Sequence, residues 1–109
     1  MAFFLDSNIV LYSLGDDQSK KEVSLALLAE KPHISTQVIN ECSHVLRRRL
    51  HWQTDQIVEV LSFILDLVIL EDMTLEHIRQ AWKIASRYGF SHYDSLIIAS
   101  ALASDCDVL

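Results

Sequence analysis

Glycine, proline and cysteine are scarce in this sequence of 109 residues, which contains 2 Gly, 1 Pro and 2 Cys. So few chain-breaking residues, in a chain that is 50% hydrophobic, exclude a disordered protein, a collagen-like repeat and a loop-dominated scaffold. The two cysteines, Cys42 and Cys106, form no CxxC pair. They therefore predict reduced intracellular thiols rather than a disulfide framework.

Long hydrophobic runs are missing as well. Residues 58–70 form the most apolar stretch, but this stretch contains Glu59 and Asp66 and is too short to cross a bilayer. The N-terminus reaches Asp6 without any basic residue, so it does not have the pattern of a signal peptide. These absences predict a soluble protein of the cytoplasm.

Positive charge is in the minority, since 9 Lys and Arg against 15 Asp and Glu give a formal net charge of −6. This balance argues against a protein that coats nucleic acid regardless of sequence, because such a protein needs a basic face to release counterions. It does not exclude an enzyme that meets nucleic acid at one metal-loaded site, because the cation reverses the local charge.

Short apolar runs alternate with helical patterns along the chain. Strands are predicted at residues 3–5, 33–35 and 68–70, and the first residues of a fourth at 107–109. Apolar residues at helical spacing predict helices at 9–12, 16–31, 36–50, 54–65, 74–88 and 91–103. This alternation is typical of an α/β/α sandwich with a central parallel sheet. We expect a single domain over residues 1–109, shortened at its C-terminal strand.

Two further sets of residues follow from the same patterns. The expected helix N-caps are Thr36, Thr54, Thr74 and Ser91. Four large aromatic residues lie among apolar neighbours and are expected in the core: Trp52, Phe63, Trp82 and Phe90.

Three carboxylates do not fit a solvent-facing position easily. Asp6 follows the first predicted strand, where open parallel sheets bind ligands, although it could equally cap the next helix. Glu41 lies inside a predicted helix beside its apolar face, unless it pairs with an arginine at 47–49. Asp94 lies in the first turn of the last helix, where the helix dipole alone would favour an acid.

Taken together, the three acids suggest a metal site. If the sheet is parallel, all three can point into one cleft at its carboxyl edge. Carboxylates brought together repel one another, and the usual compensation is a hard cation such as Mg²⁺ or Mn²⁺. Such an ion can activate a water for in-line attack on a phosphodiester.

Three blocks around these acids carry a family resemblance. Residues 3–10 read FFLDSNIV, residues 34–41 read ISTQVINE, and residues 92–99 read HYDSLIIA. In this order the blocks resemble PIN domains, the PilT-N-terminus-like ribonucleases that include the toxins of VapBC-type toxin–antitoxin pairs. The resemblance covers essentially the whole chain.

The resemblance implies a Mg²⁺- or Mn²⁺-dependent endoribonuclease, with Asp6 and Asp94 as metal ligands. Glu41 would be a further ligand or would orient the attacking water. The polar groups that hold the site in shape would be Asn8, Thr36 and Ser7. Cleavage would leave 5′-phosphate and 3′-hydroxyl ends on the RNA.

The resemblance also implies partners: an antitoxin protein and a second copy of the chain in a homodimer. Family members carry a further acidic residue beyond the strand that begins here near Val108, and this sequence ends before it. The alternative is therefore a shortened PIN-like module that binds a partner without cleaving RNA.

Other groups of residues are weaker candidates for a functional site. Glu41 and His44 have the spacing of two metal ligands on one helix face, but the HExxH pattern of zinc sites is missing. The arginines at 47–49 span about 200° of a helix, so they cannot all face one ligand. They form either a solvated helix end or, in part, a contact with RNA phosphate beside the metal site.

A strand that ends in aspartate also begins the haloacid-dehalogenase-like phosphatases. There the acid/base is an aspartate two positions later, and this sequence has Asn8, which cannot transfer a proton. A phosphatase of that class is therefore not expected.

Overall fold

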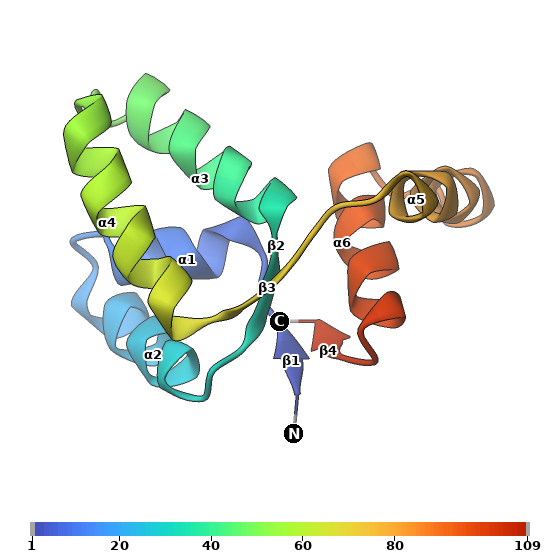
Figure 1. The fold of residues 1–109 in the computed structure, drawn as a ribbon, viewed down its shortest axis with the longest axis horizontal. Coiled ribbons are helices and arrows are strands. Elements are labelled where there is room, and N and C mark those ends of the chain that lie inside the picture. The colour runs from blue at the N-terminus through green and yellow to red at the C-terminus, as the bar shows by residue number, and fades with distance from the viewer. Residues whose placement is uncertain (1, 109) are drawn as a thin grey trace.

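In the computed structural model, which describes residues 2–108, helices and short strands alternate (Figure 1). The elements are β1 (Phe3–Phe4), α1 (Ser7–Ser13), α2 (Gln18–Ala29), β2 (His33–Ser35), α3 (Thr36–Arg48), α4 (Thr54–Leu67), β3 (Ile69–Glu71), α5 (Leu75–Tyr88), α6 (His92–Ala103) and β4 (Asp107–Val108). The strand predicted at 107–109 is therefore found as β4, with residue 109 outside the described part. No helix within residues 2–108 is long and apolar enough to span a membrane.

The four strands form one parallel sheet in the order β3-β2-β1-β4, which confirms the predicted sheet. Successive strands step outward from β1 to β2 and β3, and the chain then returns to place β4 on the other side of β1. Parallel crossovers are almost always right-handed, so this reversal sends α5 and α6 to the opposite face from α1–α4 (Figure 1). The reversal makes the carboxyl end of β1 a topological switch point, where α/β sheets bind ligands.

The core is divided by the sheet. The large cluster lies between the sheet and α1–α4, and its buried members are Leu5, Val10, Leu28, Ile34, Val38, Cys42, Leu46, Ile57, Leu61, Ile64 and Val68. On the other face, Ile97 and Ala101 of α6 pack against Phe4 of β1. This second contact fixes α6, and with it Asp94, beside the end of β1.

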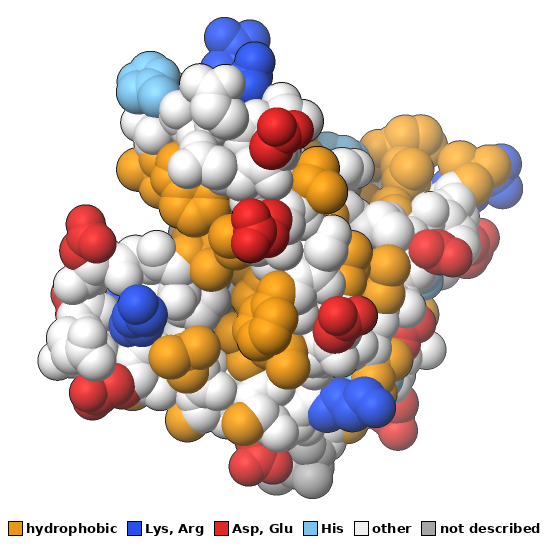
Figure 2. Space-filling view, turned by 60° about the vertical axis from the view of Figure 1, so that its left-hand side comes forward, with side chains coloured by type: hydrophobic (Ala, Val, Ile, Leu, Met, Phe, Trp, Pro, Cys, Tyr) orange, Lys and Arg blue, Asp and Glu red, His pale blue; other side chains and the backbone are white. Residues whose placement is uncertain are grey.

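Three of the four aromatic residues expected in the core are not there. Trp82, Phe63 and Phe90 are 57%, 63% and 48% exposed, and only Trp52 packs against the main core. The apolar pattern gives a wrong prediction for Trp82 because α5 packs mainly on α6, and Ala81 is the residue of this helix that is buried. Figure 2 shows the resulting surface on one side of the molecule, with hydrophobic side chains spread among single charged ones.

Two of the four expected N-caps are confirmed, since Thr74 caps α5 and Ser91 caps α6. In α3 and α4 the cap is instead the residue just before the expected threonine, namely Ser35 and Gln53. Ser35 can do this because the last residue of β2 keeps an extended backbone while its hydroxyl turns toward the first helical turn.

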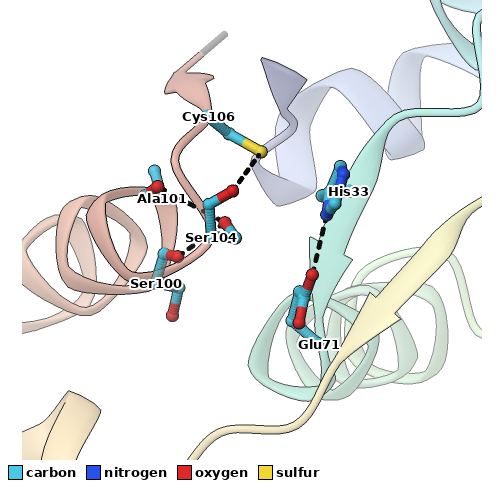
Figure 3. Close-up of polar contacts among 6 residues, drawn as sticks. All are labelled: His33, Glu71, Ser100, Ala101, Ser104 and Cys106. Atoms are coloured by element: carbon cyan, nitrogen blue, oxygen red, sulfur yellow. Dashed lines mark hydrogen bonds and ion pairs between the residues drawn. The ribbon is translucent and has the colours of Figure 1, made fainter. Parts of the chain in front are cut away.

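Side-chain contacts fix the edges of the sheet (Figure 3). Nδ1 of His33 lies 2.7 Å from Oε1 of Glu71, which joins β2 to β3. At the end of α6, the Ser104 hydroxyl donates to the Ser100 carbonyl at 2.8 Å, and the Cys106 thiol donates to the Ser104 carbonyl at 3.5 Å. These bonds shape the turn that returns the chain to β4 beside β1.

Candidate functional site

Asp6 lies at the carboxyl end of β1 and is half-buried. Its Oδ1 accepts hydrogen bonds from the backbone nitrogens of Asn8 at 3.0 Å and Ile9 at 3.3 Å, so it caps α1. Both bonds go to the same oxygen, and Oδ2 accepts none from the described residues. The two interpretations of Asp6 are therefore compatible, because one oxygen caps the helix while the other remains for a ligand.

Asp94 lies in the first turn of α6, and its side chain is exposed. It lines a cavity of about 230 Å³ together with Asp6, Phe90, Ile97 and Ile98. The strand order explains this meeting of distant residues, since α6 packs on β1 just before the chain enters β4. Neither carboxylate forms an ion pair with a cation in the described part of the chain.

Glu41 lies on α3 and is held by two donors. The Ser7 hydroxyl, in the first turn of α1, donates to Oε2 at 2.9 Å, and the Gln37 amide donates to Oε1 at 3.5 Å. No ion pair joins Glu41 to an arginine within residues 2–108, so the expected alternative of a structural salt bridge is wrong for this part of the chain. Ser7 connects Glu41 to the residue next to Asp6.

A second cavity, of about 480 Å³, begins at Glu41 and lies between α3 and α6. Its other lining residues are Gln37, Asn40, His44, Val45 and Tyr93. Tyr93 is the neighbour of Asp94, and Glu41 is bonded to the neighbour of Asp6. The two cavities are therefore adjacent, with the paired aspartates in one and the glutamate in the other.

The pKa of Cys42 depends on the negative charge of the candidate site. Its side chain is buried, and its thiol donates to the Ser7 carbonyl at 3.8 Å. Burial raises the pKa of the Cys42 thiol to about 12, and the negative charges of Glu41 and Asp6 add to the rise. Both carboxylates thus act on one thiol, although nothing in the sequence pattern singled out Cys42.

The three acids do not form one tight cluster. Among residues 2–108, no three His, Cys, Asp or Glu side chains lie close enough together to hold one ion. The structure pairs Asp6 with Asp94 and keeps Glu41 next to them through Ser7. Two carboxylates with water completing the shell is an arrangement that Mg²⁺ commonly takes.

The other residues expected to shape the site have different contacts. Asn8 is exposed and contributes its backbone nitrogen to the cap at Asp6. The hydroxyl of Thr36 accepts from the backbone nitrogen of Met73 at 3.0 Å, so it ties α3 to the segment before α5. Ser7 is the one of these three residues whose side chain contacts a candidate site carboxylate, that of Glu41. Its position directly after Asp6 is the sequence feature that indicates this role.

Comparison with known proteins gives the same fold. The PIN domain family model matches residues 3–109. VapC20 of Mycobacterium tuberculosis, a sarcin–ricin loop cleaving toxin, is 20% identical with a TM-score of 0.78, covering 95% of this chain and 84% of that one. A search of curated proteins by sequence finds no match.

Two other solved structures are similar over nearly the whole chain. A toxin–antitoxin complex from Klebsiella pneumoniae is 15% identical with a TM-score of 0.76, covering 97% of this chain and 82% of that one. VapBC2 from Rickettsia felis, bound to a DNA fragment from its promoter, is 21% identical with a TM-score of 0.73, covering 99% of this chain and 85% of that one. These likenesses show the fold. The match of the family model over residues 3–109 shows more, namely that this chain belongs to the PIN domain family.

Proposed function

We propose that this chain is a divalent-metal-dependent endoribonuclease and the toxin of a toxin–antitoxin pair. The observation that carries the proposal is the cavity at the switch point of the sheet, which Asp6 and Asp94 line together. Membership of the PIN family and the likeness to toxin structures support the choice of RNA as substrate. The products would carry 5′-phosphate and 3′-hydroxyl ends.

The donor set of this cavity fits a hard divalent cation. Asp6 offers Oδ2, Asp94 offers an exposed carboxylate, and no Lys or Arg within the described residues neutralises either group. Mg²⁺ or Mn²⁺ would be held by these two side chains. When bound, such an ion lowers the pKa of a coordinated water and neutralises charge on the phosphate.

Glu41 has a separate part in the proposed reaction. Ser7 donates to Oε2 at 2.9 Å, while Oε1 has only the longer contact of 3.5 Å with Gln37. Oε1 is therefore the atom available to orient the attacking water or to accept its proton. Ser7 and Gln37 hold the carboxylate in position, and Glu41 lines the cavity between α3 and α6.

The proposal includes an antitoxin and a second copy of the chain as partners, and a cytoplasmic location. Two of the similar structures are toxin–antitoxin assemblies, which supports the first partner. Exposed apolar side chains support binding of other chains. Val23 and Phe63 lie on α2 and α4, and Trp82 and Leu102 lie on α5 and α6. Part of this surface is seen in Figure 2.

Cleavage assays on a mixed RNA substrate test the proposal. We expect cleavage that requires Mg²⁺ or Mn²⁺ and falls by orders of magnitude in Asp6→Asn, Glu41→Gln and Asp94→Asn. Asp66→Asn is the matched control, because Asp66 is an exposed acid on α4 away from both cavities. Mn²⁺ should also raise the melting temperature of the parent but not of the Asp6→Asn, Asp94→Asn double variant, since only native protein binds the ion.

Two results would contradict the proposal. Cleavage retained in Asp6→Asn would place the activity elsewhere or in a contaminant. A parent that stays inactive at saturating Mn²⁺ would favour the alternative, a PIN-like module that binds a partner without cleaving RNA.

A further inference from the structure

Glu41 shares one side of α3 with two residues that the proposed chemistry leaves unused. An α-helix turns about 100° per residue, so Arg48 lies within about 20° of Glu41 and two turns further along, at a rise of about 10 Å. His44 lies between them, one turn from each. The three side chains form a stripe that runs from the carboxylate end of the helix to its basic end.

Two cavities follow this stripe and share His44. The first is the cavity of about 480 Å³ that begins at Glu41. The second, of about 560 Å³, lies between α3 and α4, and its lining residues are Ser43, His44, Arg47, Arg48, Thr54, Ile57 and Val58. In Figure 1, α3 runs between α4 and α6. The two hollows lie on these two sides of α3 and meet at His44, and together we call them the α3 groove.

The charges along the α3 groove suit a polyanion. Arg48 is exposed, and its side chain forms neither a hydrogen bond nor an ion pair with the part of the chain that the structure describes. Arg47 is held toward α4, because its Nη1 donates to the Thr54 hydroxyl at 3.0 Å. Arg49 lines neither cavity. Arg48 is thus a cation without a partner among the described residues, and it lines the hollow next to the one that Glu41 lines.

The opposite wall of the α3 groove carries an aromatic ring. Tyr93 of α6 is 56% exposed and lines the same hollow as Glu41 and Asn40. Exposed aromatic rings beside a basic groove bind single-stranded nucleic acid, because every base can stack on them while the cations hold the backbone. A ligand that is only a phosphate would need the arginine but not the aromatic ring. The ring therefore favours a nucleic acid strand as the ligand.

We infer that the α3 groove binds the single-stranded RNA segment next to the cleaved bond, with a backbone phosphate at Arg48 and a base on Tyr93. The inference rests on the proposed function, since it takes the ribonuclease centre to lie at the Glu41 end. It adds a substrate path that leads away from that centre along α3 toward the corner between α3 and α4.

Binding without cleavage tests the groove separately from the chemistry. The parent and its variants are titrated by fluorescence anisotropy against a labelled single-stranded RNA of about a dozen nucleotides, in EDTA, over a range of salt. Loss of one phosphate contact should reduce the slope of log K against log salt by about 0.7 in Arg48→Gln. If the affinities of the parent and Arg48→Gln are equal when extrapolated to 1 M salt, this difference in slope makes the variant bind roughly fivefold more weakly than the parent at about 0.1 M salt.

Two further variants separate this groove from general charge. Arg49→Gln removes the same charge outside the groove and should keep the parent's slope and affinity. Tyr93→Leu should weaken binding several-fold without changing the slope, because stacking releases no counterions. Unchanged melting temperatures would show that the exposed substitutions leave the fold intact.

Equal salt slopes for the parent, Arg48→Gln and Arg49→Gln would overturn the inference, and so would a parent that does not bind the RNA at all. Metal-dependent cleavage that is lost in Asp6→Asn, together with equal slopes, would refute the groove and keep the proposed function. Binding that depends on Arg48 in a protein that never cleaves would refute the nuclease and keep the groove.

Discussion

The thiol of Cys42 can be used to measure whether Asp6 and Glu41 act on the same place. Burial raises its pKa from 9.0 to about 12, and the charges of Glu41 and then Asp6 contribute to the rise. Neutralising either carboxylate should lower the Cys42 pKa, with a larger effect for Glu41→Gln than for Asp6→Asn. Asp94→Asn should leave it unchanged, because Asp94 is not among the causes of the shift.

The shift also predicts how stability depends on pH. Below pH 9 the thiol is protonated in both the native and the unfolded chain, so it has no effect on the free energy of unfolding. Between about pH 9 and about pH 12 the unfolded chain loses this proton and the native protein keeps it, so stability falls as pH rises. The slope approaches 1.4 kcal/mol per pH unit, and the full loss is about 4 kcal/mol.

The assay is an ultraviolet absorbance titration of the thiolate in a Cys106→Ser background, which leaves Cys42 as the only cysteine. Urea unfolding at several alkaline pH values, compared with Cys42→Ala in the same background, isolates the stability term from the titration of tyrosine and lysine. A Cys42 pKa near 9 would refute the reasoning. A drop in Asp94→Asn as large as that in Glu41→Gln would refute the charge arrangement.

Three substitutions test the fold by urea or thermal unfolding. Ser35→Ala should cost about 1–2 kcal/mol, because the buried hydroxyl caps α3 by accepting from the Val38 nitrogen at 3.2 Å. Gly89→Ala should cost about 1–2 kcal/mol, because the residue that ends α5 has φ +74°, which disfavours any Cβ even where space is open. Ser100→Ala should be neutral or stabilising by up to about 1 kcal/mol, since its buried hydroxyl has no partner among the described residues. A clear loss of stability in Ser100→Ala would show that this hydroxyl has a partner.

The order and type of the elements could be predicted from the sequence because they depend on local patterns. The strand predicted at residues 33–35 is β2, and the helices predicted at 74–88 and 91–103 are α5 and α6 to within a residue. Apolar spacing, capping residues and Gly89 act over a few positions, so they can be recognised without knowing the neighbours in space. The three blocks that resemble PIN domains were informative for the same reason, and the family match confirms them.

Burial depended on tertiary packing. Trp82 lies on the apolar face of α5 but is exposed, because this helix has α6 on one side only. A sequence pattern shows which face of a helix is apolar, but it does not show whether a partner covers that face.

The geometry of the candidate site was also decided by the tertiary structure. The strand order places β1 between β2 and β4, and in this order α6 packs beside β1, so that Asp94 lines the same cavity as Asp6. The same packing places the first turn of α1 against α3. There the Ser7 hydroxyl donates to Glu41, and no arginine of the described residues forms an ion pair with this carboxylate. Which carboxylate meets which donor depends on how elements that are distant along the chain pack together. A local sequence pattern extends over a few residues and therefore carries no information about this packing.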